Sequence, residues 1–208
     1  MPEFRVHPLE ATNVPALVGL ESALHVAFAG VESRWLYRAI CQDALRGGRV
    51  VCLVSEIEGQ LAGFVIAFVN AAAYWKELVV RRPVLAFRIM AGRLWRKTAR
   101  GGAAGSAAPR SSDLFETGQA PGNWAESNDS IAKIQFIGVA PLFRGEGIGM
   151  ELYKRLAVHL QERGLARVDA RIAADNTASI KLHHAAGWKL YADEDGVFAV
   201  YPLQWKKP

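Results

Sequence analysis

Cysteine is scarce in this chain: only two of its 208 residues are cysteines. Cys41 falls in an expected helix and Cys52 in an expected strand, and neither has a second ligand at metal-site spacing. A disulfide framework and a thiolate metal centre are therefore excluded. We expect two reduced, buried thiols and no bound metal, as is usual in cytoplasmic proteins.

Long apolar runs and an export signal are missing as well. No apolar stretch approaches the ~20 residues that a helix needs to span a bilayer. Residues 1–4 do not begin the basic, apolar and small-residue order of a signal peptide. With 51% hydrophobic and 22% charged residues, the composition is that of a folded globular protein. We predict one cytoplasmic domain over residues 1–208.

Positive charge is concentrated in one segment, residues 76–100. This segment has eight cations and one anion, Glu77, so it carries +7 and leaves −2 for the rest of a chain whose net charge is +5. The cations are Lys76, Arg81, Arg82, Arg88, Arg93, Arg96, Lys97 and Arg100. Because the excess is local, we expect no general affinity for nucleic acid, but a local anionic partner or surface.

Apolar periodicity divides the chain into strand and helix patterns. Alternating or continuous apolar runs predict strands over 4–9, 49–57, 60–69, 131–139, 167–173, 188–191 and 197–203. Helical spacing predicts a helix that starts near Val14, and further helices over 33–45, 147–163 and 176–186. The order is β-α-α-β-β, then a break, then β-α-β-α-β-β, which predicts an α/β protein.

The break, residues 71–130, is an insertion with two parts. Residues 72–98 predict a basic amphipathic helix or helix pair with Pro83 at a bend. Residues 99–130 are rich in Gly, Ala, Ser and Pro and contain few large apolar side chains, which predicts a flexible loop.

A glycine-rich turn carries the chemical signal. Residues 137–149 read Ile-Gly-Val-Ala-Pro-Leu-Phe-Arg-Gly-Glu-Gly-Ile-Gly, a strand that runs into a turn and then a helix. Gly145, Gly147 and Gly149 allow close approach of a ligand to the backbone, and the helix N-terminus and Arg144 add positive charge. The combination predicts a pyrophosphate site.

A dinucleotide-binding fold is the natural rival, since Asp169 lies at a suitable distance in sequence for a ribose contact. The glycine spacing is Gly-x-Gly-x-Gly, however, and not Gly-x-Gly-x-x-Gly. The site also comes late in the chain, without a βαβαβ unit before it. Both features weigh against the rival.

Two motifs in this order resemble the GCN5-related N-acetyltransferase (GNAT) family. The acetyl-CoA signature Arg/Gln-x-x-Gly-x-Gly/Ala is matched by Arg144, Gly147 and Gly149, after a Val-x-Pro at Val139 and Pro141. An Asn and a helix that ends in Gly-aromatic follow over residues 176–188. The resemblance covers residues 131–203 and implies a mixed, mostly antiparallel sheet of six or seven strands, with central strands that diverge at Val139 and Ala173.

The resemblance also implies which residues hold acetyl-CoA. The backbone of Ile137, Gly138 and Val139 would pair with the pantetheine arm. The pyrophosphate would be held by the turn Arg144, Gly145, Glu146, Gly147, Ile148 and Gly149. Asn176 would touch the cofactor near its reactive end.

Two departures from the family pattern concern proton transfer. Many members have a tyrosine seven residues after the Asn as proton donor to the thiolate, and this chain has His183 there. We take His183 as the catalytic candidate, with a packing role as the alternative. Several members place a glutamate four residues before the valine, where this chain has Gln135, which cannot take a proton. The base is then a water chain or an insertion carboxylate: Glu77, Glu116 or Glu126.

The favoured function is transfer of an acetyl or other short acyl group to the amine of a small molecule, for example an amino sugar. The alternatives are acetylation of a peptide or protein, and a CoA-binding module without catalysis. For the basic segment 76–100, a lid over an anionic acceptor is slightly favoured over an interfacial helix on anionic lipid, because the loop 99–130 would let a lid open. A third hypothesis is that this segment is a solvent-exposed surface with no part in function. Oligomeric state is left open.

Overall fold

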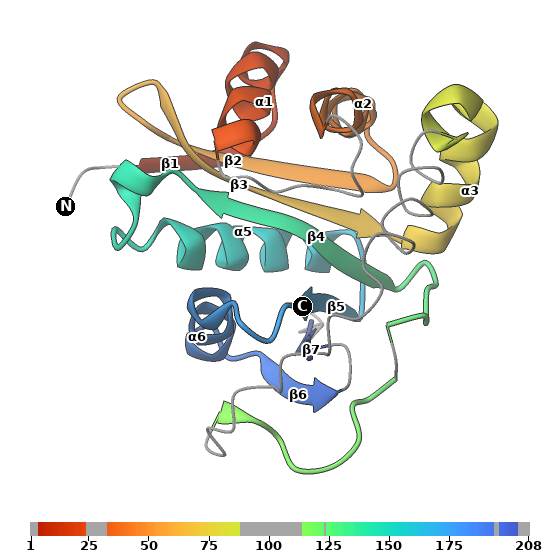
Figure 1. The fold of residues 1–208 in the computed structure, drawn as a ribbon, viewed down its shortest axis with the longest axis vertical. Coiled ribbons are helices and arrows are strands. Elements are labelled where there is room, and N and C mark those ends of the chain that lie inside the picture. Colours follow the sequence, from red (N-terminus) through yellow and green to blue (C-terminus); the bar gives the residue numbers. More distant parts are fainter. Residues whose placement is uncertain (1–3, 24–32, 88–113, 123, 194–195, 204–208) are drawn as a thin grey trace, which may run out of the picture.

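The computed structural model describes residues 4–23, 33–87, 114–122, 124–193 and 196–203 (Figure 1). Its strands form one seven-stranded sheet in the spatial order β1-β2-β3-β4-β5-β7-β6. The strands are β1 (Phe4–Pro8), β2 (Val50–Ile57), β3 (Gln60–Val69), β4 (Ile131–Val139), β5 (Arg167–Ile172), β6 (Lys189–Asp193) and β7 (Gly196–Pro202). Neighbouring strands are antiparallel except β4 and β5, which are parallel. The predicted mixed, mostly antiparallel sheet is confirmed.

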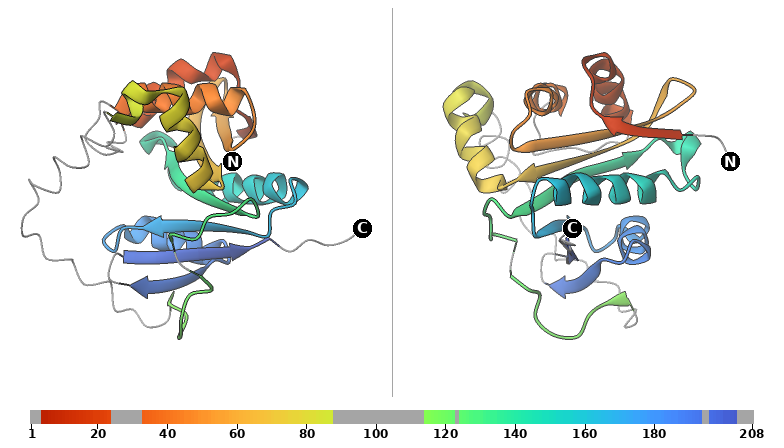
Figure 2. Two further views of the ribbon diagram at one scale, coloured as in Figure 1. Left: turned by 90° about the vertical axis from the view of Figure 1, so that its right-hand side faces the viewer. Right: turned by 180° about the vertical axis from the view of Figure 1, so that it is seen from behind.

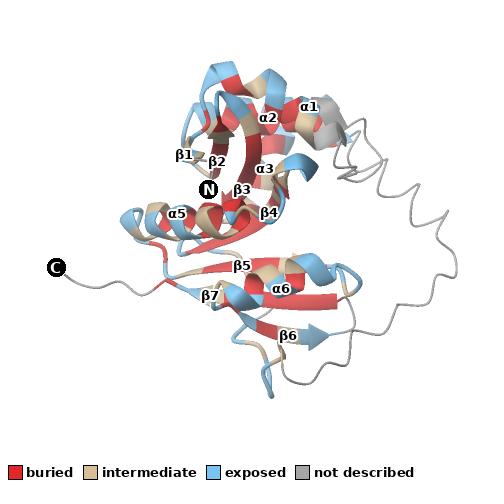
Figure 3. Cartoon of the chain, turned by 90° about the vertical axis from the view of Figure 1, so that its left-hand side faces the viewer, coloured by how far each residue is buried: buried red, intermediate tan, exposed pale blue. Residues whose placement is uncertain are grey.

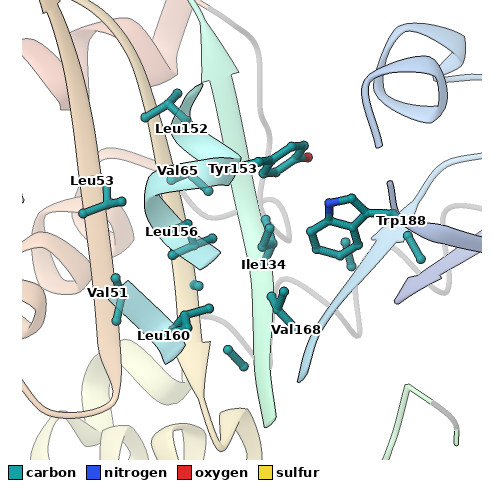
Figure 4. Packing of buried hydrophobic residues seen from close by; sticks show 14 of the residues in the cluster. Val51, Leu53, Val65, Ile134, Leu152, Tyr153, Leu156, Leu160, Val168 and Trp188 are labelled. Carbon is teal, nitrogen blue, oxygen red and sulfur yellow. The ribbon is translucent and has the colours of Figure 1, made fainter. Parts of the chain in front are cut away.

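Helices cover both faces of the sheet (Figures 1 and 2). They are α1 (Val14–Ala23), α2 (Ser33–Leu45), α3 (Ala71–Arg81), α5 (Ile148–Glu162) and α6 (Thr177–Ala185), with short 3-10 turns η1 (Ala11–Asn13) and η3 (Pro141–Phe143). On one face, Leu17 of α1 and Leu36 of α2 pack with Phe64 of β3 in one buried cluster. On the other face, α5 packs Leu152, Leu156 and Leu160 against Val65 and Ile134 (Figure 4). Figure 3 shows the resulting burial along the central strands.

The hairpin of β2 and β3 follows from its turn residues. Glu58 has φ 49° and Gly59 has φ 75°, and two successive positive φ angles match the right-handed twist of the flanking strands. Cys41 and Cys52 are buried and unpaired, and burial raises the pKa of the Cys41 thiol to about 12. Among the described helices, none has both the length and the apolar character needed to cross a lipid bilayer.

The central strands diverge earlier than expected. β4 and β5 pair only from Ile131 with Arg167 to Ile134 with Ala170, so the separation begins there and not at Val139 and Ala173. The register of β3 against β4 shifts between Ile66 and Ala67, which leaves Gln135 without a pairing partner. This bulge bends β4 away from β5.

The insertion starts and ends at adjacent points. Asn70 adopts φ 48° and caps α3, with its Oδ1 accepting a hydrogen bond from the Ala73 N–H at 3.2 Å. Its own N–H donates to the Ile131 carbonyl at 3.0 Å, 61 residues further along the chain. The predicted helix over 72–98 is confirmed to Arg81, breaks at Arg82 before Pro83, and resumes over 83–87. Its remainder and the first part of the expected loop, 88–113, lie outside the described residues.

Residues 114–122 and 124–130, in the expected loop, form turns and bends and contact the rest of the protein at several points. Leu114 and Phe115 lie against the core on the α5 face. Lys133, a buried residue of β4, donates to the Trp124 carbonyl and lies 4.8 Å from the centre of the Trp124 ring. The sequence pattern misses this anchoring because a few long-range contacts, and not a continuous apolar run, hold the segment.

Candidate active site

The glycine-rich turn joins β4 to α5 and exposes backbone N–H groups. Gly145 has φ 90°, and Gly147, the N-cap of α5, has φ 80° and offers no side-chain cap. The first intrahelical bond runs from the Glu151 N–H to the Gly147 carbonyl at 3.1 Å. The N–H groups of Ile148, Gly149 and Met150 therefore have no acceptor within the helix and are suited to an anion.

The three glycines have different tasks. A Cβ atom at Gly145 or Gly147 would meet nothing within 4 Å, so these two are required by their positive φ and leave open space above the backbone. A Cβ at Gly149 would lie 2.9 Å from Cδ2 of Leu182, so this glycine lets α5 and α6 approach each other. Gly149 thus serves helix packing, a role that its sequence motif did not predict.

A cavity of about 820 Å³ lies in the gap between β4 and β5. It is lined by β4, the turn after it, the first turn of α5, the end of β5 and the α6 region. Of the predicted cofactor residues, all except Glu146 line it: Ile137, Gly138, Val139, Arg144, Gly145, Gly147, Ile148, Gly149 and Asn176. From Gln135 onward no described strand pairs with the β5-facing edge of β4, so backbone groups of this edge are open to a ligand.

Asn176 caps α6 at the rim of this cavity. Its Oδ1 accepts a hydrogen bond from the Ser179 N–H at 3.1 Å. This bond satisfies an N–H that the first turn of α6 would otherwise leave open. Arg144 is exposed, and its Nε–H donates to the Val139 carbonyl at 3.3 Å, which places the cation beside the turn.

His183 also lines the cavity, but it is buried and bonded on both ring nitrogens. Nδ1 lies 2.7 Å from the Ser179 carbonyl, which can only accept, so Nδ1 carries the hydrogen. Nε2 is then an acceptor, and the Tyr153 hydroxyl donates to it at 2.8 Å. Burial lowers the pKa of His183 to about 4, opposed by the bond to Ser179. The imidazole is neutral at pH 7, and this geometry counts against direct proton donation.

Tyr153 and Trp188 complete the surroundings of His183, and the sequence argument missed Tyr153. The Trp188 ring stands edge-on to the His183 ring at 4.8 Å, and Tyr153 lies 5.4 Å from Trp188 (Figure 4). Trp188 belongs to the Gly-aromatic motif, whereas Tyr153 is on another helix and has no motif around it. Tyr153 follows Gly149 by about one helical turn, and this spacing is the one sequence feature that could have indicated its place beside the site.

None of the proposed insertion bases lines the cavity. Glu77 pairs with Arg49 at 2.8 Å, and Glu126 pairs with Arg167 at 2.7 Å. Glu116 is exposed and likewise absent from the lining. Within the part of the chain that the structure describes, the titratable side chains of the lining are Arg144, Arg171 and His183, and no carboxylate is among them. Arg171, also missed, binds Asp193 in β6, with Nη1 to Oδ2 at 2.6 Å.

Residues 117–188 match the model of the acetyltransferase (GNAT) family, a range that includes β4, the glycine-rich turn and α6. This segment is similar in sequence to the GNAT family. No group of His, Cys, Asp and Glu side chains able to hold a metal ion occurs among the described residues of this chain.

Two curated relatives are mycothiol acetyltransferases. That of Renibacterium salmoninarum is 31% identical over 75 residues, 36% of this chain and 22% of the relative. That of Streptosporangium roseum is 33% identical over 67 residues, 32% of this chain and 20% of the relative. The matched part is about a fifth of the length of these relatives.

Solved GNAT structures share the fold across almost the whole chain. The ribosomal-protein-S18-alanine N-acetyltransferase of Escherichia coli superimposes with a TM-score of 0.57 at 17% identity, covering 97% of this chain and 95% of that one. The PaiA N-acetyltransferase of Thermoplasma acidophilum, solved with coenzyme A, gives 0.59 at 10% identity, covering 96% and 99%. At these identities the likeness shows the GNAT fold.

Proposed function

We propose that this protein transfers an acetyl or other short acyl group from acetyl-CoA to the amine of a small molecule. The observation that carries the proposal is the cavity at the β4–β5 divergence, which has an anion-binding turn at one end and an open strand edge along its side. A pyrophosphate fits the N–H groups of Ile148, Gly149 and Met150, and an amide-containing arm fits the open edge of β4. Asn176 lies at the α6 side of the same cavity.

Acetyl-CoA supplies the reaction with an activated thioester carbonyl. The chain would position it: N–H groups on the open edge of β4, next to Gln135, can polarise the carbonyl oxygen. The attacking amine must be neutral, so it has to lose a proton before or during attack. With no carboxylate along the described lining, we assign this proton to solvent water. kcat/KM should then rise with pH towards the pKa of the acceptor amine.

For His183 we propose a positioning role instead of proton donation. The Tyr153 hydroxyl and the Ser179 carbonyl hold the imidazole between α5 and α6. The His183 ring bonds to the Ser179 carbonyl, and the Asn176 side chain accepts a hydrogen bond from the Ser179 N–H. Both bonds therefore meet at Ser179, near the start of α6. His183 would thus fix the α6 side of the cavity, and the leaving thiolate would be protonated from water.

The test is a thiol-release assay with acetyl-CoA and a panel of amines that includes amino sugars, small amine metabolites and short peptides. Thiol release that depends on a small amine supports the proposal. Release with peptides alone would favour peptide or protein acetylation.

A second candidate is a CoA-binding module without catalysis, which is favoured by Gln135 and by the absence of a carboxylate from the described lining. Calorimetry separates this candidate from an inactive preparation. Tight CoA binding without thiol release on any amine would support the module and overturn the enzymatic proposal.

A further inference from the structure

Large apolar side chains are exposed on the first part of the insertion. Among the described residues, seven large hydrophobic side chains are exposed, and four of them fall within residues 79–87. They are Val79, Val80 (82% exposed), Val84 (72%) and Phe87 (67%). Burying such side chains is favourable, so a short stretch that exposes four of them indicates an interaction surface.

These side chains point away from the protein. The buried face of α3 carries Ala71, Tyr74 and Leu78, which lie at helical spacing towards the sheet. Val79 and Val80 follow Leu78 by about 100° and 200° around the helix axis. Val79, Val80 and Arg81 are all exposed to solvent at the end of α3.

Cations accompany the apolar side chains. Lys76 and Arg81 are exposed on the same helix, whereas the one anion, Glu77, is engaged by Arg49 at 2.8 Å and by Arg81 at 3.2 Å. The sequence then adds five cations and no anion between residues 88 and 100. An apolar surface beside an excess of positive charge is complementary to an anionic lipid surface.

The position of α3 disfavours a lid over the cavity. α3 follows β3 at the Ile131 end of β4, whereas the glycine-rich turn follows Val139 at the other end, roughly 25 Å along the strand. No residue of 71–87, all of which the structure describes, lines the cavity. A second copy of the chain is disfavoured as well, because it would bring two equally cationic surfaces together.

We propose that residues 76–87 dock on an anionic membrane surface. Val80, Val84 and Phe87 enter the boundary between headgroups and acyl chains, and Lys76 and Arg81 lie at the level of the lipid phosphates. This peripheral attachment does not depend on the acyltransfer chemistry.

Vesicle flotation of the full chain tests the proposal, with phosphatidylcholine vesicles and with vesicles that also contain phosphatidylglycerol. The wild type should bind the anionic vesicles and release them at high salt. The variant Val80→Ser/Val84→Ser/Phe87→Ser should lose at least tenfold in binding. Lys76→Gln/Arg81→Gln should lose roughly fivefold per cation. Val158→Ser, an exposed valine on α5, is the matched control and should bind like the wild type.

Three outcomes would overturn the proposal. They are equal binding to neutral and anionic vesicles, wild-type binding by the triple serine variant, and a dimer in ultracentrifugation that the triple variant abolishes while vesicles remain unbound. Acetyl-CoA affinity measured on every variant reports folding of the core. It also keeps this result separate from failure of the proposed enzymatic function.

Discussion

For His183, the role predicted from the sequence, proton donation, differs from the role that its surroundings in the structure favour. Its position, seven residues after Asn176, correctly indicated that it would line the cavity. Its chemistry is set by Tyr153, thirty residues earlier and on another helix, and by a backbone carbonyl. No local pattern reports such contacts, so the tautomer and the neutral state could not be predicted. The exposed neighbour, His184, lies away from the site, as the helical spacing predicts.

Burial of His183 should make the protein less stable in acid. The folded pKa is about 4, below the unfolded value near 6.5, so the unfolded chain binds a proton first as the pH falls. The free energy of unfolding should be unaffected above pH 6.5 and should lose about 3 kcal/mol by pH 4 from this group. Urea unfolding at several pH values measures the slope. His183→Phe should reduce it and the matched His184→Phe should not; equal slopes in both variants would contradict the assignment.

Gly147 offers a test of the cofactor site with an internal control. Gly147→Val places a side chain in the open space above the turn and should weaken acetyl-CoA binding more than tenfold, about 1.4 kcal/mol. Gly164, at the other end of α5, has a similar φ of 76° and equally open surroundings. Gly164→Val should therefore cost similar backbone strain but retain affinity. Calorimetry on both variants decides, and equal affinities would remove the turn from the cofactor site.

At the scale of helices and strands, the sequence predicted most of what the structure contains. α2 and β4 have the predicted limits, because glycines or polar residues bound clear apolar patterns. The early divergence of β4 from β5 was not predictable, because it follows from a register shift against β3. The contacts of residues 114–122 and 124–130 were missed for a related reason: several involve charged residues, which a sequence pattern predicts to be solvent-exposed.

Arg167 is the anchor of that packed segment. Its guanidinium donates to the Pro121 carbonyl at 2.7 Å, to Glu126 at 2.7 Å and to the buried Asp169 at 3.0 Å. Arg167→Met should lower the free energy of unfolding by about 3 kcal/mol, because it leaves a buried carboxylate without its strongest partner. The exposed pair of Arg155 and Glu151 is the control, and Arg155→Met should cost under about 1 kcal/mol. Equal losses in urea unfolding would contradict the anchoring role.

At the scale of the whole molecule, the described strands form two parts of one sheet, β1–β4 and β5–β7, which are joined by the short β4–β5 pairing. A ligand in the cavity contacts both parts and should stabilise them together. At a concentration about 100 times Kd, acetyl-CoA should add about 2.7 kcal/mol. For a chain of this size, Tm should rise by roughly 5–10 °C in calorimetry. The Gly147→Val protein should show a much smaller rise; an equal rise would place the ligand elsewhere.

The hydrogen bond between Asn70 and Ile131 has a consequence for how this protein could have been assembled. β3 and β4 are antiparallel neighbours and would form an ordinary hairpin if a two-residue turn joined them, so residues 71–130 are an insertion at a hairpin tip. Replacing these residues with Asn-Gly should abolish vesicle flotation and lower the free energy of unfolding, because the buried contacts of Tyr74 and Leu78 and the bonds of Arg167 to Pro121 and Glu126 are lost. Circular dichroism and calorimetry would show whether the shortened chain still folds and binds.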